Sequence, residues 1–137
     1  SDAGIDIADM LLPECTITYM EDKNGKKKYY NSDASKTDLK YELLVNGNSA
    51  STSEILACAI QDNNGGKIIG TKTFGKGIVQ STYTFKDGSA LKLTTMQYFS
   101  PKGKVIHKIG ITPDYIVKLK DGDTTDYQLN KAIELLK

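Results

Sequence analysis

The stretch NGNSASTSEILACAIQ (residues 46–61) predicts a turn followed by a buried helix. Asn46-Gly47 is a turn signal, and the residues from Ile55 to Ile60 are apolar or small without a break. A helix that is apolar on nearly every side packs inside a domain rather than on its surface. We therefore expect a buried helix over Ser51–Gln61, with serines gathered around its start.

Helices and strands alternate on both sides of this segment. Helical spacing of apolar residues begins at Ile5 and ends before Pro13, and a second amphipathic pattern covers Asp126–Lys137. Strands are expected at Thr16–Glu21, Lys27–Tyr30, Tyr41–Val45, Lys67–Gly70, Val79–Phe85 and Leu91–Phe99. The alternation indicates an α/β fold, and 137 residues fit a single domain.

The charge balance argues against nucleic acid as a partner. Eighteen Lys and Arg face seventeen Asp and Glu, which leaves a net charge of +1. A domain that binds nucleic acid through its phosphates carries a clear excess of positive charge. The dense basic run Lys23–Lys28 contains Asn24-Gly25, a hairpin turn signal, so we interpret it as a solvated hairpin tip.

No metal or cofactor motif is present in the sequence. Cys15 and Cys58 are far apart, and His107 has no partner at ligand spacing, so a zinc site is not expected. Cys58 lies in the apolar helix, where a small buried thiol is the usual interpretation. No apolar run reaches the length of a membrane span, and we expect no signal peptide within these 137 residues.

Ser51 has two interpretations. Ser51-Thr52-Ser53-Glu54 fits a capping box, in which the serine caps the helix and the glutamate reaches back to it. The same serine can instead act as a nucleophile, because the amides at a helix start stabilise developing negative charge. On this segment alone, capping is favoured.

Lys76 strengthens the interpretation of Ser51 as a nucleophile. It lies between two glycines in the segment TFGKGIVQ (residues 73–80). Such a lysine is usually an exposed turn residue, but glycine also allows close backbone approach and can bring the amine into a crowded site. A lysine acts as a base only when neutral, which requires burial to lower its pKa from about 10.4. Gln80 carries an amide that can orient the amine.

Together these segments resemble the carboxyl-terminal processing (tail-specific) peptidases. The resemblance extends through DGSALKLTT (87–95), YFSPKG (98–103) and GITPD (110–114), in order and spacing, and covers almost the whole chain. It implies a crotonase-like (Clp-type) serine peptidase core that uses no cofactor. The serine-rich helix start combined with Phe-Gly-Lys-Gly-x-Val-Gln is specific, whereas either half alone would be weak.

The family's catalytic residues match residues of this chain without a gap. Its nucleophile matches Ser51, its general base Lys76 and its orienting glutamine Gln80. By this resemblance Ser51 forms an acyl-enzyme with a protein or peptide substrate, and water then hydrolyses it. The backbone N–H of Thr52 would be one oxyanion donor. Family members usually carry alanine there. Because the donor is a backbone group, threonine is expected to be tolerated, with crowding by its branched side chain as the alternative.

The resemblance also implies parts that lie outside these 137 residues. The family's glycine-rich segment, which supplies a second oxyanion donor, and its PDZ domain both precede the first residues here. We therefore expect residues 1–137 to form a single, partial peptidase core. Losing one oxyanion donor costs roughly 10²–10³ in rate, so this piece alone is expected to be weakly active.

Other interpretations remain open. His107 and Asp114 suggest a Ser-His-Asp triad, but His107 matches no catalytic residue of the family, and a structural role is favoured. A non-catalytic interaction module that keeps the peptidase fold is the main alternative function. The family implies an extracytoplasmic place in bacteria, periplasmic or membrane-anchored, whereas the oligomeric state does not follow from the sequence.

Overall fold

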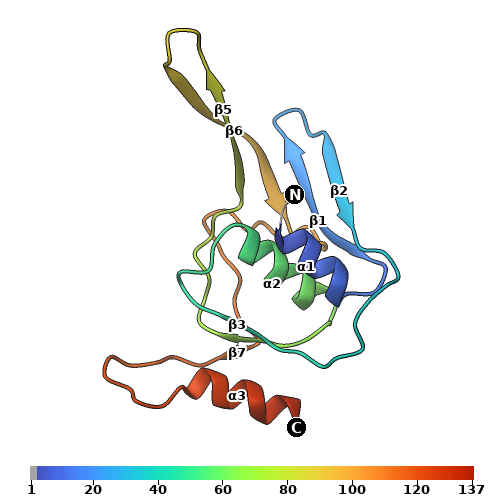
Figure 1. Ribbon diagram of the computed structural model, residues 1–137, viewed down its shortest axis with the longest axis vertical. Coiled ribbons are helices and arrows are strands. Elements are labelled where there is room, and N and C mark those ends of the chain that lie inside the picture. Colours follow the sequence, from blue (N-terminus) through green and yellow to red (C-terminus); the bar gives the residue numbers. More distant parts are fainter. Residues whose placement is uncertain (1–2) are drawn as a thin grey trace.

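Residues 3–137 are described by the computed structural model, and their strands form two sheets. The larger sheet is antiparallel, with the order β2-β1-β6-β5. Its strands are β1 (Thr16–Asp22), β2 (Lys27–Asn31), β5 (Ile78–Thr84) and β6 (Ala90–Phe99). The predicted hairpin at Asn24-Gly25 joins β1 to β2, and the β5–β6 hairpin extends away from the body of the molecule (Figure 1).

The smaller sheet is parallel, and the buried helix is the crossover between two of its strands. Its strands are β3 (Leu43–Val45), β4 (Ile68–Gly70) and β7 (Tyr115–Ile116), in the order β3-β4-β7. Helix α2 (Thr52–Asp62) connects β3 to β4, which makes a βαβ unit. The sequence did not predict β7, because two residues are too short to show a strand pattern.

Helix α2 lies beside α1 (Ala3–Leu11) in the middle of the molecule, and α3 (Tyr127–Leu136) lies near the smaller sheet (Figure 1). The hydrophobic core between the helices and the sheets includes Ala8, Leu12, Ile17, Ile55, Ile60, Ile68 and Ile106. Cys58 is part of it as predicted, and burial raises the pKa of its thiol. No helix of residues 3–137 is long and apolar enough to cross a membrane. The predicted α/β alternation is confirmed, with small shifts at element ends.

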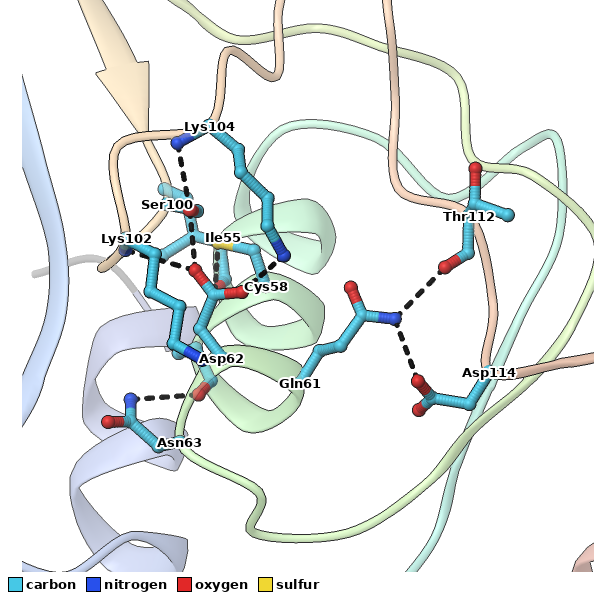
Figure 2. A network of polar contacts seen from close by, with 11 residues as sticks. Ile55, Cys58, Gln61, Asp62, Asn63, Ser100, Lys102, Lys104, Thr112 and Asp114 are labelled. Atoms are coloured by element: carbon cyan, nitrogen blue, oxygen red, sulfur yellow. Dashed lines mark hydrogen bonds and ion pairs between the residues drawn. The ribbon is translucent and has the colours of Figure 1, made fainter.

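A buried carboxylate at the end of α2 holds the turn that follows β6 (Figure 2). Oδ2 of Asp62 accepts hydrogen bonds from the Ser100 hydroxyl (2.5 Å) and the Lys102 N–H (3.0 Å). Oδ1 accepts one from the Lys104 ammonium at 2.6 Å. Nearby, the Gln61 amide donates to the Thr112 carbonyl at 3.0 Å. The far end of α2 is therefore fastened to two loops.

These bonds determine how Asp62 titrates. Burial by itself would raise the pKa of the carboxyl, but the bonds from Lys104, Ser100 and Lys102 outweigh it and hold the pKa below the usual range. Because the pKa is lower in the folded state, the stabilisation is complete above the unfolded pKa of about 3.9. It is lost as the pH falls through the lower, folded value.

Asp62→Asn should lower the free energy of unfolding by about 1.5–3 kcal/mol at pH 7, because the amide replaces a charged acceptor. The difference from wild type should shrink as the pH falls below about 3.9, because the carboxyl of the unfolded chain is protonated there and that of the folded protein is protonated at lower pH. Urea unfolding at pH 7 and at pH 3 measures both effects. Asp121→Asn, at an exposed position, is the matched control. An equal effect at both pH values would contradict the assignment.

Candidate active site

Ser51 precedes α2 in a strained backbone conformation. Its φ is 55° and its ψ is −113°. A helix-capping residue normally has extended backbone angles, and a positive φ is uncommon for any residue other than glycine. Strain of this kind concentrates where function requires a side chain to be held in one direction. Capping alone does not account for this geometry.

The Glu54 carboxylate joins Ser51 to the segment that carries Lys76. Glu54 is fully buried, with 0% of its surface exposed. Its Oε2 accepts hydrogen bonds from the backbone N–H of Ser51 (3.0 Å) and of Lys76 (2.8 Å). Its Oε1 accepts from the Gly75 N–H (2.7 Å) and the Thr73 hydroxyl (2.5 Å). Four donors offset the cost of burying the carboxylate and hold both segments in register.

The capping box explains only part of this arrangement. Glu54 does reach back to the Ser51 N–H, as predicted. Its contacts with residues 73–76 were missed, because the sequence shows Glu54 only as a helix-start residue. The available signal was the helix itself: when α2 is apolar nearly all round, a glutamate in its first turn must lie in the core.

The glycines around Lys76 allow close packing against residues 106–110. Gly75 has a φ of 91°, and its carbonyl accepts from the Lys108 N–H at 2.8 Å. A Cβ on Gly77 would lie 2.5 Å from the backbone nitrogen of His107, so no larger residue fits there. Close backbone approach was the predicted use of these glycines. Lys76 itself is exposed, so the burial expected for a neutral lysine is not provided by residues 3–137.

The three predicted catalytic residues nevertheless meet in one hollow. Ser51, Lys76 and Gln80 line a cavity of about 250 Å³. The cavity is completed by Ile78, Val79, Lys92 and Tyr98. Within residues 3–137 no hydrogen bond joins the side chains of Ser51, Lys76 and Gln80 to one another, so the hollow brings them together without locking them.

Thr52 directs its side chain away from this hollow. Its hydroxyl accepts a hydrogen bond from the Gly4 N–H at 3.0 Å, next to the start of α1. A Cβ on Gly4 would lie 2.5 Å from the same hydroxyl, so glycine is needed for the contact. The side chain of Thr52 therefore does not crowd the hollow, in keeping with the tolerance expected at this position.

Comparison with known proteins identifies the family. The model of peptidase family S41 matches residues 1–117. The chain belongs to peptidase family S41. The predicted resemblance is thereby confirmed, together with the α/β peptidase core that it implied.

Relatives of this S41 chain are processing proteases. The carboxyl-terminal-processing proteases of Synechocystis sp. and Picosynechococcus sp. are 40% and 39% identical over 141 residues, and each match covers 98% of this chain. A solved structure of a photosystem II D1 C-terminal processing protease has a TM-score of 0.81 at 33% identity; the match covers 98% of this chain and 34% of that one. The S41 chain spans about a third of the length of the two relatives, 33% and 34%.

His107 and Asp114 do not join Ser51. Neither side chain lines the hollow of Ser51 and Lys76. Asp114 accepts hydrogen bonds from the Gln61 amide (3.1 Å) and the Ile68 N–H (2.8 Å), which fasten the start of β4. His107 lines a separate hollow beside β1 and β6. The geometry therefore gives no support to a Ser-His-Asp triad in this S41 chain.

Replacing Glu54 by glutamine should destabilise the protein. The amide offers one acceptor oxygen in place of two, and its NH₂ would face backbone donors. We expect the free energy of unfolding to fall by about 2–4 kcal/mol, as measured by urea unfolding at pH 7. Glu134→Gln, an exposed ion-pair partner on α3, is the matched control and should change little. Equal unfolding midpoints for the two variants would show that the carboxylate does not hold the segments together.

Proposed function

We propose that this chain is the catalytic core of a serine endopeptidase that cleaves proteins near their C-terminal tails with a Ser51–Lys76 dyad. The observation that carries the proposal is the strained backbone of Ser51, which faces the same hollow as Lys76. Glu54 binds the backbone of both residues. Membership of family S41 supports the same activity.

The reaction begins when the neutral Lys76 amine takes the proton of the Ser51 hydroxyl. The Ser51 oxygen forms a bond to the scissile carbonyl carbon, and the negative charge that develops on the carbonyl oxygen is stabilised by the Thr52 N–H. Lys76 then gives its proton to the leaving amine as the peptide C–N bond breaks. Water hydrolyses the resulting ester, with Lys76 again acting as base.

Lys76 must lose its proton before this cycle can start. Because its side chain is exposed in residues 3–137, we propose that bound substrate or other parts of the full-length protein cover it. Gln80, in the same hollow, would orient the amine. The upstream glycine-rich segment would supply a second oxyanion donor near Thr52, where the start of α1 lies.

The names of the relatives supply the rest of the proposal. Two are carboxyl-terminal-processing proteases, so the substrates proposed here are proteins with accessible tails, selected by a PDZ domain of the full-length chain. An extracytoplasmic location, periplasmic or membrane-anchored, is proposed from the family alone. A non-catalytic module is less favoured, because such a module has no use for the strain at Ser51.

Ser51→Ala in the full-length protein should abolish peptide cleavage, because it removes the nucleophile. Ser53→Ala is the matched control: Ser53 is exposed on the first turn of the same helix, and its loss should leave most of the activity. The measurement is kcat/KM on a peptide substrate, with thermal unfolding to verify that both variants fold. Similar losses in two folded variants would remove Ser51 from the mechanism.

Lys76→Arg and Lys76→Ala should both be inactive, because a guanidinium does not deprotonate and alanine has no base. The pH profile of kcat/KM for the wild type should rise as Lys76 loses its proton, since only the neutral amine accepts one. A solvated turn lysine would instead accept arginine without loss of cleavage. Substantial cleavage by Lys76→Arg would therefore eliminate the dyad.

A further inference from the structure

A second lysine faces the proposed catalytic hollow. Lys92 lies on β6, opposite Thr82 of β5, and Gln80 lies opposite Thr94 in the same ladder. Residues two apart on a strand share a face, so Lys92 is a diagonal neighbour of Gln80 on that face of the sheet. Lys92 also lines the hollow that contains Ser51 and Lys76.

The charge in this hollow is not balanced. Among residues 3–137, its lining contains two lysines and no carboxylate. The nearby Glu54 is buried and already accepts four hydrogen bonds. Within residues 3–137 the Lys92 ammonium has no ion-pair partner; the recorded pairs use Lys27, Lys36, Lys104 and Lys131.

In the proposed mechanism, the excess positive charge of the hollow lies on Lys92. A base must be neutral when it takes the serine proton, so Lys76 contributes no positive charge at that step. Lys92 is then the remaining cation among the described residues of the lining. An unpaired ammonium beside a reacting peptide favours an anionic group and disfavours a cationic one.

We propose that Lys92 binds a carboxylate of the substrate close to the scissile bond and so sets specificity for acidic tails. The inference rests on the proposed function, because it places the substrate in the hollow of Ser51. The carboxylate can come from an Asp or Glu side chain or from the free C-terminus of a short tail. Both sources offer the same charge-assisted hydrogen bond to the ammonium.

The test uses matched peptides and the full-length protein. One set carries Asp or Glu at each position within three residues of the scissile bond, and a second set carries Asn or Gln there. A third pair differs only in a free or an amidated C-terminus. Wild type should cleave at least one carboxylate peptide with a KM about tenfold below that of its amide counterpart.

Lys92→Met should reduce this preference to about one, mainly through KM, and Lys92→Glu should reverse it. Lys86→Met, in the exposed turn of the same hairpin, is the control and should keep the wild-type preference. The peptide pair whose KM values differ identifies the source of the carboxylate. A difference in an Asp/Asn or Glu/Gln pair indicates an acidic side chain, and a difference between free and amidated C-termini indicates the terminal carboxylate. A wild type without preference, or an equal loss on every peptide in Lys92→Met, would overturn the proposal.

Calorimetric binding of the same peptides to Ser51→Ala separates this inference from the peptidase proposal. If Ser51→Ala still cleaves peptides, the proposed nucleophile is wrong, whatever Lys92 does. If Ser51→Ala is inactive but binds carboxylate and amide peptides equally, Ser51 stands as the nucleophile and the Lys92 inference fails. Tighter binding of the carboxylate peptide, lost when Lys92→Met is added to Ser51→Ala, would support it.

Discussion

The buried carboxylate of Glu54 is the constraint on which the rest of the site depends. It binds the backbone of Ser51 with the same oxygen that binds the backbone of Lys76. A charged group with no exposed surface is tolerated only when hydrogen bonds replace its water, and here four donors from two segments do so. Burial of the carboxylate therefore keeps the two segments aligned, because separating them would leave it in the core without hydrogen-bond donors.

Helix α2 carries this alignment through the molecule. Its first turn contains Glu54, and its last turn contains Asp62, which holds the turn after β6. Between them the helix is almost entirely core, packed against α1 and the strands around it. Strand β6 also carries Lys92, so one helix connects the position of Ser51 to the strand on which Lys92 lies. A rigid body suits this task better than a loop.

Local patterns predicted most of the fold, and long-range contacts set the limits of that prediction. The hairpin at Asn24-Gly25, the buried helix and the close packing at Gly75 and Gly77 all follow from residues adjacent in sequence. The strain at Ser51 does not, because it arises from folded context. The same holds for the bonds of Glu54 to residues 73–76 and for the partner of β7. The sequence also did not predict the exposure of Lys76 within residues 3–137, since its glycine neighbours indicate close backbone packing and not the position of the side chain.

The projecting β5–β6 hairpin has a consequence for the solubility of residues 1–137 in isolation. Its outer part exposes Tyr83, Phe85, Leu91 and Leu93, each with 44–53% of its surface accessible. Strand β5 is also a sheet edge, whose unpaired backbone groups can recruit a strand from another chain. Apolar side chains on an open edge favour self-association as the protein concentration rises. A purified protein of these 137 residues should remain monomeric best at low concentration, and mild denaturant should suppress its self-association before the core unfolds.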